Sequence, residues 1–258
     1  MIIRRLASTL QLISQPDHAA LAFRIMGAWD VTHFPESPRK PSILSAIEHH
    51  DDGWAEADDT LIVDETSGQL LDFIHAPDTV KRDTSSRGIE RLEADPYAAA
   101  LVAQHRLHVY RRYASDPEWR AFFLEVTTAR DTYMRAAGSI PLSDLLDDYR
   151  LVRAGDLAPL AFCNQWTSTD ADECGYAIHF DGTALRIIPD PFAGRAIEIE
   201  IDAREIPDHP FASQAEAQRG WRPRRSSDFK QLAIVNRQPV VVPFNSNAPD
   251  LLISCYPS

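Results

Sequence analysis

Cysteine is scarce in this chain of 258 residues. Cys163, Cys174 and Cys255 are its three cysteines, and no two of them form a Cys-x-x-Cys pair. Three cysteines are too few for a disulfide framework. We therefore expect a reducing, cytoplasmic setting for the protein.

Long hydrophobic runs and positive charge are also in short supply. No segment approaches the ~18 uninterrupted apolar residues of a membrane span. The N-terminal segment MIIRRLASTLQLIS is followed by Gln15-Pro16-Asp17, which interrupts it too early for the apolar core of a signal peptide, and we read it as a short strand or extended segment. The 26 basic residues are outnumbered by 38 acidic ones, which gives a net charge of −12. This charge repels phosphate backbones and anionic membranes, so we expect neither nucleic acid nor a membrane as a partner.

The first two thirds of the chain has the periodicity of helices. We expect Asp17 to cap the first of them and Pro159 to kink or locally break the last. Residues 51–88 are rich in Asp, Thr, Ser and Gly, and they are expected to form a long functional loop. The expected helices are 18–30, 41–50, one starting at Asp95-Pro96, 116–137 and 142–165.

After residue 166 the period changes to that of strands. Asp181-Gly182 is typical of a hairpin turn between the first two strands. We predict a mainly α domain at 1–165 with a β-rich extension at 166–258 packed on the helices, which makes the chain α+β overall. The expected strands are 176–180, 184–188 and 195–201, with weaker candidates at 234–242 and 251–255.

Histidines are concentrated near the N-terminus, where seven of the nine lie within the first 108 residues. A lone histidine is usually a packed or surface residue, and we keep that interpretation for His33, His179 and His209. His49 and His50 cannot both face one centre from a regular helix, because neighbours point about 100° apart. The segment after His50 could also be a plain helix C-terminus with Gly53 as the residue after the cap.

The segment AIEHHDDGW resembles the signature of the HD-domain superfamily, in which a His-Asp doublet ends a helix. That superfamily has a further histidine on an earlier helix and an aspartate on a late one. PDHAAL offers His18 for the first role, and RAGDLAPLAFCNQW offers Asp156 for the second. More narrowly, the chain resembles a bacterial family of HD-like proteins, domain of unknown function 3891. The matching pieces are MIIRR, QPDHAALA, AIEHHDDGW, DPYAAALVAQH and DLAPLAFCN.

The resemblance implies a metal centre that is built by histidine and aspartate. Imidazole nitrogen and carboxylate oxygen suit iron, manganese or zinc. Members with two metal ions add two histidines between the doublet and the last aspartate, so one or two ions are implied. His108 is an alternative ligand or a substrate contact. The implied ligands are His18, His50, Asp51 and Asp156 for the first ion, with His75 and His105 for a second.

The implied activity is hydrolysis of a phosphate ester by a metal-activated water. Asp52 or Glu48 is a candidate proton acceptor. A two-iron oxygenase with the same ligands and a non-catalytic binding or sensory module are the alternatives. The homo-oligomeric state stays open.

An anionic small-molecule substrate would need contacts beyond the metal. Trp54 either walls the pocket or stacks on the substrate. Arg82 is the candidate cation for binding the substrate, with Lys81 and Arg87 beside it in the sequence. The alternative is that all three are surface charges, like the basic run at 219–225.

Overall fold

The computed structural model describes residues 1–169, 174–220 and 230–235. It confirms a helix-rich α+β protein with small, largely antiparallel sheets. None of the helices in these ranges combines the length and apolar character needed to cross a bilayer.

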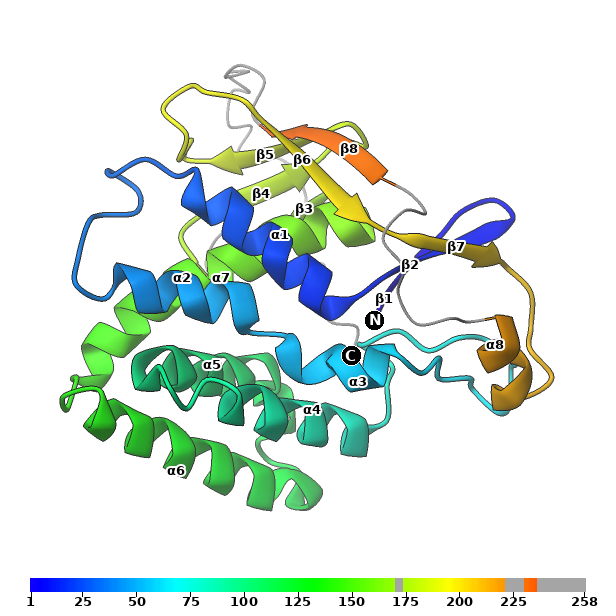
Figure 1. The fold of residues 1–258 in the computed structure, drawn as a ribbon, viewed down its shortest axis with the longest axis horizontal. Helices are drawn as coiled ribbons and strands as arrows, with labels where there is room; N and C mark the ends of the chain where they lie inside the picture. The colour runs from blue at the N-terminus through cyan, green and yellow to red at the C-terminus, as the bar shows by residue number, and fades with distance from the viewer. Residues whose placement is uncertain (170–173, 221–229, 236–258) are drawn as a thin grey trace, which may run out of the picture.

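Four helices form the centre of the molecule. α1 contacts α2 and α7, and α5 contacts α2 and α7. α6 covers the outer side of α5, while α4 packs against α5 and the turn η1 (Figure 1). The helices are α1 (Gln15–Gly27), α2 (Lys40–His49), α4 (Asp78–Glu90), α5 (Pro96–Val109), α6 (Arg120–Ala136) and α7 (Leu142–Asn164). The shorter pieces are η1 (Asp52–Trp54), α3 (Ala55–Asp58), η2 (Arg111–Tyr113), η3 (Pro117–Trp119) and α8 (Gln214–Gly220).

Two sheets lie against this helical centre. One has the order β1-β2-β7, so the segment after residue 166 supplies a strand to the N-terminal hairpin. The other has the order β3-β4-β5-β8-β6, and α1 and α7 lie between it and the remaining helices (Figure 1). The strands are β1 (Ile2–Arg5), β2 (Thr9–Ile13), β3 (Ser168–Thr169), β4 (Ala177–Phe180), β5 (Ala184–Ile188), β6 (Ile197–Asp202), β7 (Arg204–Pro207) and β8 (Lys230–Val235).

The expected strands agree with the sheets where the structure describes them. β4 and β5 pair around the Asp181-Gly182 turn, which confirms the hairpin. β8 overlaps only the start of the candidate at 234–242, whose remainder lies outside the described residues together with 251–255. A division into domains at residue 165 stays a prediction.

Two local details of the helices differ from the sequence predictions. Ser14, not Asp17, caps α1: its hydroxyl accepts from the Asp17 backbone N–H, and Pro16 fits the first turn, where no N–H partner is needed. The expected loop at 51–88 contains the helix α4. Periodicity missed this helix because its inward face carries mainly small or polar residues, among them Thr84, Ser85 and Gly88.

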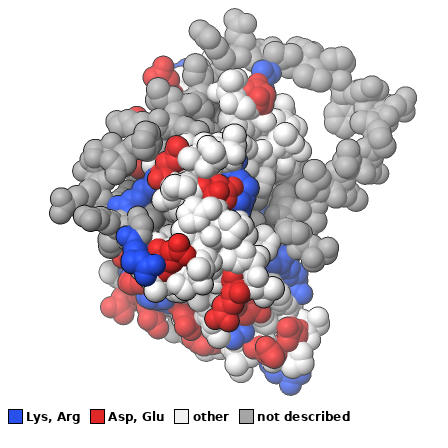
Figure 2. All heavy atoms as spheres, turned by 90° about the vertical axis from the view of Figure 1, so that its right-hand side faces the viewer, with Lys and Arg blue, Asp and Glu red and all other residues white. Residues whose placement is uncertain are grey.

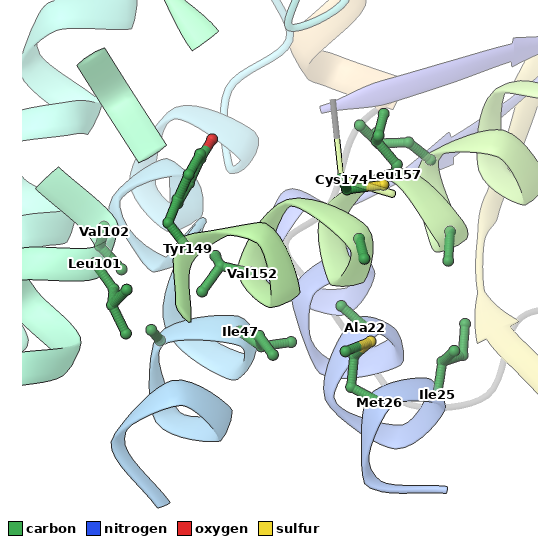
Figure 3. Packing of buried hydrophobic residues seen from close by; sticks show 14 of the residues in the cluster. Ala22, Ile25, Met26, Ile47, Leu101, Val102, Tyr149, Val152, Leu157 and Cys174 are labelled. Atoms are coloured by element: carbon green, nitrogen blue, oxygen red, sulfur yellow. The ribbon is translucent and has the colours of Figure 1, made fainter. Parts of the chain in front are cut away.

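The core brings together the helices that carry the candidate ligands. Ala22, Ile25 and Met26 of α1 meet Ile47 of α2 and Val152 of α7 in one buried cluster (Figure 3). A Cβ on Gly155 would lie 3.1 Å from both the Met26 Cγ and the Ile47 Cγ2, so this glycine allows α1, α2 and α7 to converge. Asp156 is the next residue, and the close packing therefore fixes its position relative to the other two helices.

α7 is anchored at its C-terminal end by a buried arginine from β1. The Arg4 guanidinium donates to the carbonyl oxygens of Phe162 (2.6 Å) and Cys163 (3.0 Å). A cation favours this end of a helix, where carbonyl groups lack partners. Burial raises the pKa of the Cys163 thiol to about 12, so this cysteine is a neutral packing residue.

Candidate metal centre

Five side chains that sequence analysis singled out converge in the helical centre. His18 comes from α1, His50 and Asp51 from the end of α2, His105 from α5 and Asp156 from α7. The most exposed of them, Asp51, is 4% accessible to solvent. Buried polar groups of this kind need partners, because their desolvation is costly.

The imidazoles of His18 and His50 face the same two carboxylates. His50 Nε2 lies 3.4 Å from Asp51 Oδ2 and 3.4 Å from Asp156 Oδ1. His18 Nδ1 lies 3.5 Å from Asp51 Oδ2. A tetrahedral site with metal–ligand bonds of about 2.1 Å has edges of about 3.4 Å between its ligand atoms. These three separations are therefore compatible with edges of a site for a first-row transition metal ion.

The hydrogen bonds of these two histidines fix which nitrogen is available. A carbonyl oxygen only accepts, so the contact of His50 Nδ1 with the Ile47 carbonyl (2.8 Å) requires a proton on Nδ1. The contact of His18 Nε2 with the Asp156 carbonyl (3.2 Å) likewise places its proton on Nε2. In the neutral rings the lone pairs are then on His50 Nε2 and His18 Nδ1. Both atoms are buried and make no hydrogen bond, and both are aimed at Asp51 Oδ2.

Two potential ligand groups overlap in this cluster. One is His18, His50 and Asp51, and the other is His50, His105 and Asp156. They share His50, whose Nδ1 is already used by the Ile47 carbonyl. The single lone pair on Nε2 can bind one ion at a time.

His105 is held differently from the other histidines. Its Nδ1 lies 3.2 Å from the Tyr149 hydroxyl, and its Nε2 lies 3.9 Å from Asp156 Oδ2. Burial lowers the pKa of His105 well below its usual value, although Asp156 opposes this effect. His105 is therefore neutral at pH 7, and in the tautomer that donates from Nδ1 to the Tyr149 hydroxyl its Nε2 offers a lone pair to the centre.

Two buried arginines, which sequence analysis missed, hold the outer oxygens of the carboxylates. Arg106 donates to Asp51 Oδ1 (2.8 Å) and to the His50 carbonyl oxygen. Arg153 donates to Asp156 Oδ2 (2.6 Å). One oxygen of each carboxylate is thus occupied, and the other faces the imidazoles. The spacing of three residues between Arg153 and Asp156 on one helix was the signal available in the sequence.

The charges of the centre favour the ionised form of both carboxylates. Burial opposes ionisation of Asp51, but His50 and Arg106 outweigh it and hold the pKa of Asp51 well below its usual range. The pKa of Asp156 is likewise lowered, because His50, His105 and Arg153 outweigh burial. Burial disfavours a charged His50, yet Asp51 and Asp156 raise its pKa. Both carboxylates are therefore ionised near pH 7, as metal ligands must be.

Three of the predicted site residues lie elsewhere. His75 is exposed and its Nδ1 lies 2.7 Å from Asp72 Oδ1, so the structure does not bring it into either ligand group. Asp52 and Glu48 flank His49 instead: His49 Nδ1 donates to Asp52 Oδ2 (2.8 Å), and its Nε2 is 3.7 Å from Glu48. His49 is the neighbour of His50 that points away from the centre, as the helical spacing predicted.

The candidate substrate contacts are spread over the helical part. Trp54 is buried and lines a cavity of only about 10 Å³, enough for about one water. The ring of His108 is 5.4 Å from that of Tyr149, whose ring is also 6.0 Å from that of His105. The guanidinium of Arg82 lies over the ring of Trp119 at 5.2 Å. The positions of Trp54, His108 and Arg82 do not identify any of them as a substrate contact.

The turn after the doublet has a structural requirement of its own. Gly53 lies in η1 and is not among the described glycines with a positive φ, so it does not act as a left-handed helix cap. Instead, a Cβ there would lie 1.9 Å from the Thr84 carbonyl oxygen. Gly53 is needed because α4 passes directly over the turn that carries Asp51.

The remaining charged and histidine residues behave as ordinary structural groups. Lys81 is buried and pairs with Asp78, so the interpretation of this lysine as a surface charge is wrong. Arg87 pairs with Glu56, and His33 bonds to the Tyr176 hydroxyl. His179 and His209 are exposed. Residues 221–225 of the basic run lie outside the described residues. On the face drawn in Figure 2, basic and acidic side chains are interspersed.

A groove of about 440 Å³ lies between α4 and α6. Its volume falls within the range of small-molecule sites. None of its lining residues is a predicted ligand. They are Ser86, Ile89, Glu90, Glu125, Val126, Thr128, Ala129, Thr132 and Tyr133.

The fold and the centre define an α+β protein with a buried His/Asp cluster that could hold a metal ion. The chain belongs to the family described as Protein of unknown function (DUF3891), whose model matches residues 1–208. This match confirms the narrower of the two sequence resemblances and covers the whole cluster. Searches of curated proteins and of solved structures returned no match.

Proposed function

We propose that this protein is a metal-dependent hydrolase of the HD type that binds one divalent transition metal ion. The observation that carries the proposal is the pair of buried nitrogens, His18 Nδ1 and His50 Nε2, that lack hydrogen-bond partners and face Asp51 Oδ2. The proposed ligand atoms are His18 Nδ1, His50 Nε2, Asp51 Oδ2 and Asp156 Oδ1.

The opposite atoms of these ligands are satisfied by the protein. Backbone carbonyls accept from His50 Nδ1 and His18 Nε2, and arginines donate to the outer carboxylate oxygens. Outer partners of this kind orient ligands toward a metal ion and fix the tautomer of each imidazole. In neutral imidazoles, both nitrogens would turn a lone pair toward one carboxylate oxygen, an arrangement that a bound cation would stabilise.

The shared histidine supports one ion rather than two. Within the described residues, the second ligand group uses the same His50 as the first. His75, the other histidine expected for a second ion, is bonded to Asp72. A two-iron oxygenase would need further histidines for its second ion, and His75 lies outside both ligand groups, so hydrolysis is the better supported activity.

The chemistry of the donor set fits iron, manganese or zinc. When bound, such an ion makes a water molecule more acidic and stabilises charge on a phosphoryl oxygen. His105 stays neutral beside Asp156 and can accept a proton at Nε2 or complete the ligand set. The Tyr149 hydroxyl orients its ring through Nδ1.

Hydrolysis is tested by loading the protein anaerobically with Fe²⁺, Mn²⁺ or Zn²⁺ and supplying p-nitrophenyl phosphate, its diester analogue and nucleotides. Metal-dependent release of p-nitrophenol or phosphate is expected. Asp51→Asn should reduce the rate by about 100-fold or more, because it removes a ligand. Asp83→Asn, an exposed change on α4, serves as the control and should match the wild type.

The proposal separates into two parts that this assay can distinguish. Tight metal binding without hydrolysis of any of these esters above the Asp51→Asn level would contradict the enzyme and favour a non-catalytic module. The roles of Asp52 and Glu48 as proton acceptors stay predictions. If Asp52 accepts the proton, Asp52→Asn should lower the rate in the same assay without loss of metal. If Glu48 does so, Glu48→Gln should have this effect.

A further inference from the structure

The groove between α4 and α6 reaches down to the hydrophobic core at a place outside the metal centre. Both helices pack on α5 and lie side by side along the groove (Figure 1). Ile89 and Val126 line its bottom, belong to the main core cluster and are only 3% and 1% accessible. Ala129 and Tyr133 line one wall and pack against the same cluster. A ligand in this groove would therefore meet mainly apolar surface in its deeper part.

The rim of the groove is polar and carries negative charge on both walls. Glu90 on α4 and Glu125 on α6 are exposed lining residues. The Ser86 hydroxyl donates to Glu125 Oε1 (3.3 Å) and connects the two walls. Within the part of the chain that the structure describes, neither glutamate forms an ion pair with a basic side chain. An apolar bottom thus lies beneath two carboxylates whose charge is not neutralised.

Tyr133 shows that the negative charge extends into the groove. Burial raises the pKa of its hydroxyl, and the carboxylates of Glu93 and Glu90 raise it further. The face of its ring would also attract a positive charge. A basic residue contacts the lining as well, because the exposed Arg135 donates to the Thr132 hydroxyl (2.9 Å). The carboxylates around the groove outnumber this cation.

We propose that the groove binds a small organic cation, in which an ammonium group is carried on an apolar body. The apolar body would lie on Ile89 and Val126, where it leaves water, and the ammonium group would bind to Glu90 and Glu125. The same carboxylates would repel an anion. The volume of about 440 Å³ suits a small molecule, and pockets between the helices of a bundle are common positions for such sites.

This inference goes beyond the proposed function and does not rest on it. None of the residues that line the groove belongs to the two potential metal-ligand groups. Loss of the metal by chelation should therefore leave binding in the groove unchanged.

The test titrates the full chain with three probes that share one apolar body. They are 4-phenylbutylamine, which is a cation at pH 7, the neutral 4-phenylbutanol and the anion 4-phenylbutyrate. Isothermal titration should give a dissociation constant of about 1 mM or tighter for the amine. The alcohol should bind about fivefold or more weakly, because it lacks the charge-assisted hydrogen bonds, and the anion should bind most weakly.

Two variants separate the contribution of charge from that of the groove itself. Replacing both carboxylates in Glu90→Gln/Glu125→Gln should weaken binding of the amine about fivefold or more and leave the alcohol unchanged. Ala129→Leu extends a side chain that lines the groove, so it should weaken amine and alcohol alike by about fivefold or more. Circular dichroism shows whether each variant is folded.

Glu118→Gln is the matched control variant. Glu118 is an exposed carboxylate outside the groove, in the turn before α6. Its loss removes one negative charge from the protein surface without changing the lining. The variant should bind all three probes as the wild type does.

Four results would overturn the proposal. The first is no binding of the amine to the wild type, and the second is binding of the alcohol or the anion as tight as that of the amine. The third is binding of the amine that neither Glu90→Gln/Glu125→Gln nor Ala129→Leu weakens, because the amine would then bind elsewhere. The fourth is a wild-type dimer that dissociates in Thr128→Arg, since a second copy of the chain would then cover the groove.

Discussion

Replacing Gly53 with alanine should destabilise the folded protein by roughly 3 kcal/mol or more, or prevent folding. The added Cβ would lie 1.9 Å from the Thr84 carbonyl oxygen and 2.7 Å from the Gly88 backbone nitrogen. These are backbone atoms of α4, so the clash cannot be relieved by turning a side chain. Urea unfolding followed by circular dichroism measures the loss of unfolding free energy.

The same substitution should also disturb the centre. Gly53 is two residues from Asp51, and α4 would have to move away from the turn that holds this aspartate. Metal affinity should fall together with stability. Gly27→Ala is the matched control, because a Cβ at Gly27 meets nothing within 4 Å at the end of α1. Equal stability of the Gly53→Ala variant and the wild type would contradict the packing of α4 over the turn.

His50→Ala should reduce the affinity for a divalent metal by about 100-fold or more. His50 Nε2 is the nitrogen that faces both Asp51 and Asp156, and both potential ligand groups depend on it. Isothermal titration with Mn²⁺ or Zn²⁺ measures the change. The unfolding transition of the metal-free variant shows whether it is folded.

The neighbouring histidine provides the matched control for this experiment. His49 is on the same helix, but its side chain is 41% exposed and bonded to Asp52. His49→Ala should keep metal affinity within about threefold of the wild type, since surface changes have small effects. Equal effects of the two substitutions would mean that the doublet does not ligate a metal through His50.

The sequence located most of the candidate centre but not its organisation. Helical geometry showed that His49 and His50 could not both face the centre, and the resemblance to the HD signature selected His50. His18, His105 and Asp156 were placed on helices. Their convergence depends on how α1, α5 and α7 pack on α2, and no local pattern encodes that packing. His75 was included because its position in the chain suited a second ion, and its contact with Asp72 was not visible in the spacing.

The missed features share a physical cause. α4 carries few apolar residues, because it packs through Gly88 and small polar side chains against a turn rather than against a wide hydrophobic face. Arg106 and Arg153 look like solvated charges in the sequence, since arginine is mostly exposed. Only the fold shows that they are buried beside carboxylates. Hydrophobic periodicity therefore predicted α1, α2, α5 and α7 well and gave no information on polar packing.

Metal stoichiometry tests the central claim most directly. Protein is purified anaerobically, stripped with a chelator, reloaded with Fe²⁺, Mn²⁺ or Zn²⁺ and subjected to elemental analysis beside Asp51→Asn. We predict one tightly held ion per chain in the wild type for at least one of these metals, and less than a tenth of that amount in the variant. No retained ion with any of them, or an equal amount in Asp51→Asn, would contradict the assignment of this cluster as a metal centre.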